Sequence, residues 1–164
     1  MRKILCLVIC LGLCLFAVSC AEKSDTAEEL LGGIMDELGN LPRGKIYYTG
    51  AEEGSDSYLS ADMIDSLYGE DGAHALGYIK NVAVYLSSFA EPCEISVFVC
   101  YSSSDALKIE RMCRERADVL LAAMRESDIC DPQLQSAVVR KGRRVVLAMT
   151  YNAPRATRVI NGII

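Results

Sequence analysis

The stretch EISVFVCYSSSD at residues 94–105 decides the fold, because it joins a strand to a helix with almost no loop between them. Its first eight residues alternate in the manner of a strand with one buried face. The residues that share this face are Ile95, Val97 and Val99. Ser102 to Asp105 follows, and Ser and Asp are the residues preferred at helix N-termini. We therefore predict a strand that passes directly into a helix.

The predicted helix carries an apolar stripe at helical spacing. The residues of this stripe are Ile109, Met112, Cys113, Ala117, Leu120 and Met124. The pattern stops near Asp128, before Pro132. Upstream, residues 81–86 alternate again, and the short turn at 87–92 favours an antiparallel pair with the strand at 94–101.

The order strand, strand, helix occurs a second time towards the C-terminus. Residues 136–140 and 143–151 read as strands, and Lys141-Gly142 suits a two-residue turn because glycine tolerates positive φ. Pro154 fits the first turn of a terminal helix that runs towards Ile164. This repeated order predicts an α+β fold of two layers, an antiparallel sheet with its helices packed on one face.

The segment that precedes the first strand-strand-helix unit is acidic. Residues 21–72 contain thirteen acidic and three basic residues. Between 24 and 40 the pattern predicts a short amphipathic helix, which Pro42 separates from a strand at 45–49. A further short helix runs from a cap at Ser60 to Leu67. We expect residues 20–44 to form an acidic tether and residues 45–164 a single domain.

The first nineteen residues have the layout of a secretory signal peptide. Arg2 and Lys3 precede an apolar run at residues 4–18, which is shorter than the roughly twenty residues of a membrane-spanning helix. Ala17-Val18-Ser19-Cys20 also resembles the lipobox of bacterial lipoproteins, in which the cysteine becomes the lipidated first residue. Ala17 departs from the leucine most frequent at that position. A secreted soluble form and an uncleaved anchor are the alternatives.

The charge of the mature chain argues against nucleic acid as a partner. Removal of residues 1–19 removes two basic residues and no acidic one, so the formal net charge of −5 becomes −7. One basic cluster stands out at the tip of the second predicted strand pair. It consists of Arg140, Lys141, Arg143 and Arg144. Such a cluster can bind anionic lipid headgroups, wall phosphates or a small anionic ligand, or it can be a solvated turn.

Four cysteines besides Cys20 lie in the mature chain, and an even number in an exported protein suggests disulfides. Cys93 and Cys100 are about 23 Å apart along one strand and cannot pair. If the long helix folds back on the strand, Cys93 and Cys130 meet at one end, so this is the bridge we consider. The alternative is that cysteine serves as a small apolar residue, as it does in the signal peptide.

Motifs for catalysis and for metal binding are missing from the sequence. His74 is the single histidine, and no nucleophile elbow accompanies it. The cysteine spacings contain no C-x-x-C, and Asp62 with Asp65 lacks the order of a calcium loop. We therefore expect no metal, no cofactor and no enzymatic activity.

Several segments together resemble a bacterial family. They are Tyr58-Leu59-Ser60 through Ile64-x-x-Leu67-Tyr68-Gly69, then residues 78–88, then Ile95-Ser96-Val97-Phe98 before a long helix. They are similar to a family of small uncharacterised lipoproteins, known only as a domain of unknown function and typical of clostridia-like Gram-positive bacteria. The resemblance covers residues 45–155. It implies a location in the cell envelope and no active-site residues.

The sequence thus predicts an envelope lipoprotein, anchored at Cys20 on the extracytoplasmic face of the cell membrane. Its domain is expected to bind an envelope protein or ligand without catalysis. One alternative is an anion binder that uses the basic cluster, and another is an envelope thiol or redox protein that uses Cys93 and Cys130. The oligomeric state is left open.

Overall fold

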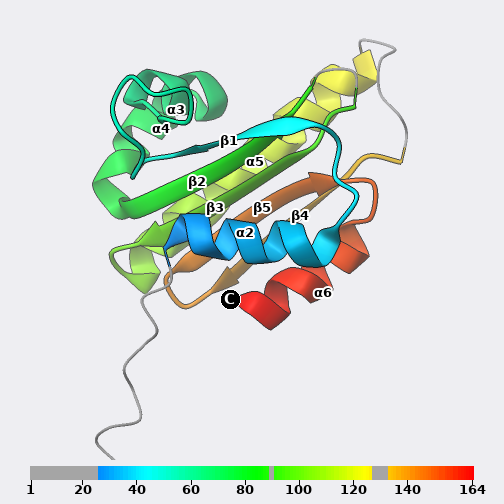
Figure 1. The fold of residues 1–164 in the computed structure, drawn as a ribbon. Helices are drawn as coiled ribbons and strands as arrows, with labels where there is room; N and C mark the ends of the chain where they lie inside the picture. Colours follow the sequence, from blue (N-terminus) through cyan, green and yellow to red (C-terminus); the bar gives the residue numbers. More distant parts are fainter. Residues whose placement is uncertain (1–25, 89–90, 127–132) are drawn as a thin grey trace, which may run out of the picture.

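A five-stranded antiparallel sheet, in the order β1-β2-β3-β5-β4, forms the centre of the computed structural model (Figure 1), which describes residues 26–88, 91–126 and 133–164. The strands are β1 (Gly44–Tyr48), β2 (Ile79–Ser87), β3 (Glu94–Cys100), β4 (Gln135–Lys141) and β5 (Arg144–Thr150). The helices are α2 (Ala27–Leu38), α3 (Ala61–Tyr68), α4 (Glu70–Ala75), α5 (Ser103–Glu126) and α6 (Ala153–Ile163), and a 3-10 turn spans Leu76–Tyr78.

The α+β class, the antiparallel sheet and the repeated strand-strand-helix order are confirmed. At the junction of β3 and α5, the Ser102 hydroxyl accepts a hydrogen bond from the amide of Asp105 at 3.1 Å. This contact satisfies an amide of the first helical turn that has no partner within the helix. The predicted cap at Ser60 is also present, since its hydroxyl accepts from the Met63 amide at 3.2 Å.

The hairpin of β4 and β5 turns one residue later than predicted. Lys141 pairs with Arg144, so Gly142 and Arg143 form the loop. Gly142 has φ of +59°, in the left-handed region that glycine enters at low cost.

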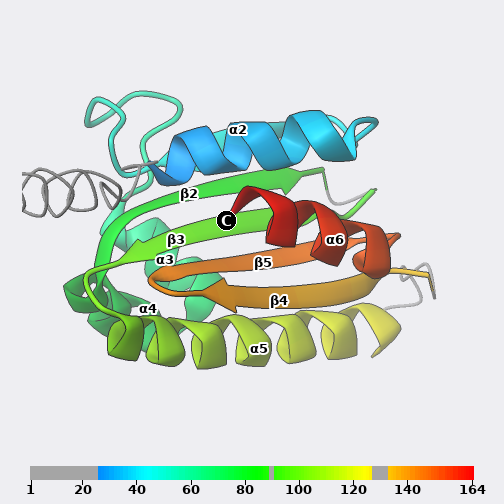
Figure 2. The same cartoon turned by 90° about the horizontal axis from the view of Figure 1, so that it is seen from below.

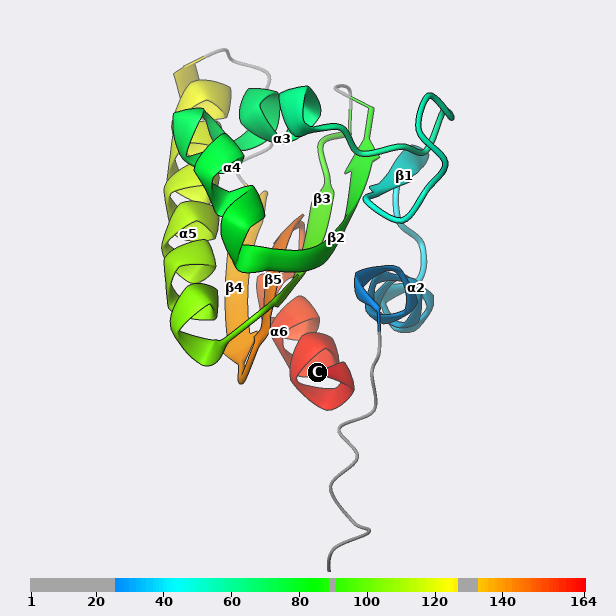
Figure 3. The same ribbon diagram turned by 90° about the vertical axis from the view of Figure 1, so that its left-hand side faces the viewer.

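Helices cover both faces of the sheet, which corrects the expectation of helices on one face. Figures 2 and 3 show α5, α3 and α4 on one side and α2 with α6 on the other. Two separate apolar cores result, one built on Phe98 and Ile109 and the other on Val97 and Ile160. The domain therefore has three layers.

The reason lies in the central strand β3, which is apolar at successive positions. In β3, Ile95 and Val97 face one core while Phe98 and Cys100 face the other. Strands buried on both faces lose the simple alternation of apolar and polar residues. Reading β3 as a strand with one buried face missed the second layer of helices.

The helix predicted between residues 24 and 40 is present as α2, but it packs on the sheet in this second layer and is part of the domain, not of a tether. Leu31 and Ile34 are fully buried against the sheet. The amide of Ala27 donates to Asn81 Oδ1 on β2 at 2.8 Å, which fixes the start of the helix. The predicted signal peptide and Cys20 lie outside the described residues.

The sheet has two ends, a proximal and a distal one. The proximal end is where α2 begins, and it contains Asn81, Cys100 and the turn after Lys141. The distal end is where β2 ends and β3 begins, and Glu94 marks it. Helix α5 runs along the sheet from the proximal to the distal end (Figure 2).

Candidate functional site

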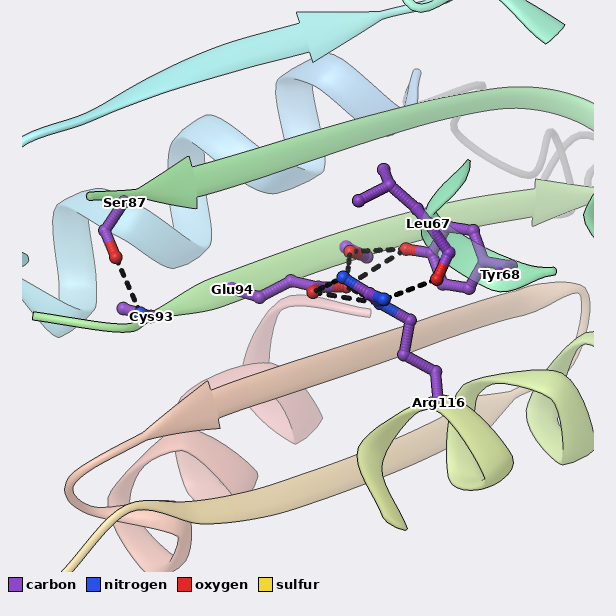
Figure 4. A network of polar contacts seen from close by, with 7 residues as sticks. Leu67, Tyr68, Ser87, Cys93, Glu94 and Arg116 are labelled. Carbon is purple, nitrogen blue, oxygen red and sulfur yellow. Dashed lines mark hydrogen bonds and ion pairs between the residues drawn. The ribbon is translucent and has the colours of Figure 1, made fainter. Parts of the chain in front are cut away.

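A buried ion pair joins the start of β3 to the middle of α5 (Figure 4). Arg116 Nη2 lies 2.8 Å from Glu94 Oε2, and Arg116 Nε lies 3.1 Å from the same oxygen. The side chains are 13% and 5% exposed, respectively. Two groups of opposite charge in this geometry can share a site of low dielectric that neither would occupy alone.

Three further groups complete the polar network around the pair. The Tyr68 hydroxyl lies 2.8 Å from Ser96 Oγ, which in turn donates to Glu94 Oε1 at 2.9 Å. Arg116 Nη1 donates to the carbonyl oxygen of Leu67. The network therefore connects α3, β3 and α5, and each charged group has more than one partner.

Burial raises the pKa of Tyr68 well above its ordinary value, and the nearby Glu94 carboxylate raises it further. The hydroxyl is thus protonated at neutral pH and serves as a donor. Its ring also contacts Phe98 edge to face, with ring centroids 5.5 Å apart, and the guanidinium carbon of Arg116 lies 5.3 Å from its centroid. These contacts fix Tyr68 in one orientation.

A cavity of about 280 Å³ lies beside this network at the distal end. Glu94 and Arg116 form its polar wall, and apolar side chains from β2, α5, β5 and the residue before β4 form most of the rest. The main apolar residues are Leu86, Leu120, Met124, Leu134 and Met149. A mostly apolar cavity with a few fixed polar groups is the usual form of a small-molecule site. We call it the distal cavity.

The cysteines of the described residues are protonated thiols in buried positions. Cys93, at the edge of the distal cavity, is free, and burial together with Glu94 raises its pKa to about 11. Burial likewise raises the pKa of Cys100 to about 12, and that of Cys113 well above its ordinary value. A thiol reacts as its thiolate, so these three residues have the chemistry of small apolar side chains. Because Cys93 has a free thiol, the predicted bridge between Cys93 and Cys130 is not present in the structure; Cys130 itself lies outside the described residues.

The basic cluster is divided between the two faces of the sheet. Arg140 pairs with Glu110 on α5, with Nε and Oε2 2.7 Å apart. Lys141 and Arg144 are register partners and therefore point to the opposite face, over which α2 and α6 pack. Arg143 is exposed in the turn itself. The sequence placed these four side chains in one cluster, but the period of two along a strand separates Arg140 from the others.

His74 lies on α4 and borders a second cavity of about 270 Å³ between this helix and α5. The other polar residues of its lining are Tyr78, Lys108, Arg111 and Glu115, and this lining contains no hydroxyl or thiol of Ser, Thr or Cys. Within residues 26–88, 91–126 and 133–164, no group of three or more His, Cys, Asp or Glu side chains is arranged to hold a metal ion.

Sequence reasoning missed the Glu94–Arg116 pair. The sequence pattern singled out neither Glu94 nor Arg116 as a candidate for a polar contact. A signal was available, because Arg116 comes four residues after Met112 and four before Leu120, which places it within the apolar stripe at helical spacing. A charged residue at such a position needs a partner on the sheet.

Comparisons with protein-family models, curated proteins and solved structures find no match for this chain. The resemblance to a lipoprotein family therefore stays a prediction. Among the described helices, none has both the length and the apolar character needed to cross a bilayer.

Proposed function

We propose that the protein is a lipoprotein of the cell envelope, anchored through Cys20 on the extracytoplasmic face of the membrane, whose α+β domain is a binding domain without enzymatic activity. The order of basic, apolar and small residues before Cys20 supports the anchor. The distal cavity supports the binding domain and carries this proposal.

The size and the walls of the distal cavity suit a small apolar group. Its volume of about 280 Å³ lies near the lower limit for ligand pockets. A ring or a short aliphatic chain fits such a space, either as a free ligand or as one side chain of a protein partner. Leu120 and Met124 provide apolar contact, and the edge formed by Arg116 can orient the polar end of the ligand.

The polar wall favours binding over catalysis. Glu94 accepts hydrogen bonds from Tyr68, Ser96 and Arg116, so its oxygens are occupied. A general base needs a lone pair directed at the substrate. The thiol of Cys93 is protonated at neutral pH, which disfavours nucleophilic attack and the redox alternative.

Two substitutions on the same helix test this proposal. Leu120 lines the cavity, while the neighbouring Val119 is 68% exposed. We expect the wild-type protein to bind the neutral fluorophore N-phenyl-1-naphthylamine saturably, and Leu120→Trp, which fills the cavity, to weaken this binding about tenfold or more. Val119→Trp adds the same ring to the surface and should bind as the wild type does. Absence of saturable binding, or equal binding by both variants, would contradict the proposal.

A further inference from the structure

We propose that the proximal end of the sheet lies against anionic phospholipid headgroups, with the turn of β4 and β5 and the side chain of Tyr101 as the contact. This proposal rests on the anchor at Cys20 proposed above. It assigns an orientation to the domain and a membrane contact to the turn that contains Lys141 and Arg143.

The chain between the anchor and the fold is short. Six residue steps separate Cys20 from Thr26, the cap of α2, and they span about 20 Å at most when fully extended. Helix α5, with 24 residues, is about 36 Å long. The tether is thus shorter than the domain, so the start of α2 and the proximal end must stay near the membrane surface.

The start of α2 and the turn of β4 and β5 lie close together, at the same end of the sheet. Ala27 is hydrogen-bonded to Asn81, and Asn81 pairs with Val99, which pairs with Arg144. Arg144 in turn pairs with Lys141. Strands are about 4.8 Å apart, so this row places Lys141 about 14 Å from Asn81 across the sheet. The alternation along the strands places these side chains on the face that α2 covers.

The turn of β4 and β5 at the proximal end is positively charged. Lys141 is exposed and has no ion-pair partner within residues 26–88, 91–126 and 133–164, and Arg143 beside it is exposed too. Basic side chains near a membrane surface are attracted by anionic lipids within a Debye length. Glu28 and Glu29 lie in the first turn of α2, and their negative charge would be repelled by anionic lipids. We therefore assign the membrane contact to the turn of β4 and β5 and not to the start of α2.

The exposed side chain of Tyr101 lies beside the same turn and favours a membrane contact there for a reason other than charge. It follows β3 directly and is 60% exposed. The amide of Cys100 donates to the carbonyl oxygen of Arg143 at 2.8 Å, which places Tyr101 beside the basic turn. Tyrosine is enriched at the level of the headgroups, because its ring is apolar and its hydroxyl is polar. An exposed tyrosine next to exposed basic residues thus suits a membrane surface.

The test compares two positions on α5, which runs from the proximal to the distal end. Ser104 and Ala123 are both exposed and lie about 28 Å apart along the helix. A fluorophore is attached at Ser104→Cys or Ala123→Cys in a Cys130→Ser background, since the other three cysteines of the domain are buried. The lipidated protein is reconstituted into phosphatidylcholine vesicles with about one third phosphatidylglycerol and a nitroxide quencher on the headgroup.

We expect quenching at residue 104 to exceed that at residue 123 about twofold or more, and the ratio to fall in pure phosphatidylcholine or at high salt. Lys141→Glu with Arg143→Glu should lower the ratio in the same way. Arg125→Glu, an exposed arginine near the distal end of α5, should leave it unchanged. Circular dichroism verifies that each variant is folded.

Equal quenching at the two positions would overturn the proposed orientation. A ratio of quenching at residue 104 to that at residue 123 that is the same in the charge-reversal variant would overturn it too. The intact mass of the starting protein separates this failure from a failure of the proposed function. An acylated protein with equal quenching contradicts the orientation alone. A protein without acyl chains contradicts the anchor.

Discussion

The two ends of the sheet treat charge in opposite ways. At the distal end, Glu94 and Arg116 are withdrawn from water and pair with each other inside the fold. At the proximal end, Lys141 and Arg143 are exposed to solvent at a tight turn. The comparison shows that the position of a charged residue along a strand decides whether its side chain is buried in an ion pair or exposed to solvent. The start of β3 lies under a helix that supplies a partner, whereas Lys141 and Arg143 lie at the tip of the β4–β5 hairpin and are exposed.

The largest effect is expected from breaking the distal pair. Glu94→Ala leaves the Arg116 guanidinium buried without its carboxylate, and we expect a loss of about 3–5 kcal/mol in the free energy of unfolding. Glu94→Leu combined with Arg116→Met removes both charges and should recover most of that loss. Urea unfolding measures both variants. A loss below about 1 kcal/mol for the single variant would show that the pair is not buried in solution.

An intermediate effect is expected where α2 is fixed at the proximal end. Asn81→Ala removes the acceptor for the Ala27 amide, and we expect a loss of about 1 kcal/mol. Hydrogen exchange should become faster at amides of α2, such as those of Leu31 and Ile34, and stay unchanged in β3. Equal acceleration in α2 and β3 would mean that α2 does not loosen separately from the sheet. Thr26→Ala removes the side-chain cap of the same helix and is the matched comparison.

The smallest effect is expected from the half-exposed pairs of Glu110. Arg114 and Arg140 both hydrogen-bond its carboxylate and lower its pKa from the ordinary value of 4.5. A carboxyl group with a lowered pKa in the folded state stabilises the fold above its unfolded pKa, and this contribution is lost as the pH falls through the folded value. Glu110→Gln should therefore cost about 0.5 kcal/mol at pH 7 and almost nothing under acid conditions. A difference from wild type that is independent of pH would contradict the assignment.

Local patterns predicted the elements well, because each depends on residues near one another in the chain. The stretch at 94–105 gave β3 and the start of α5, and the repeated order gave the second hairpin and α6. The number of layers could not be predicted from residues that are near one another in the chain. It depends on whether both faces of β3 are covered, and Phe98 and Cys100 beside Val97 were the available indication.

The candidate site was harder to predict than the fold. Arg116 and Glu94 are 22 positions apart, and they meet only because α5 folds back along β3. The same return places Leu120 and Met124 opposite Met149 around the distal cavity. The basic cluster was visible in the sequence, but its division between two faces follows from the register of β4 and β5.

The anchor at Cys20 is the central claim, because the proposed orientation of the domain depends on it. The most direct test is the intact mass of the protein isolated from membranes, measured for the wild type and for Cys20→Ala. We predict a wild-type mass of residues 20–164 plus acyl chains, and loss of both the acyl chains and membrane retention in the variant. An unmodified wild-type chain, or one that keeps Met1, would contradict the account.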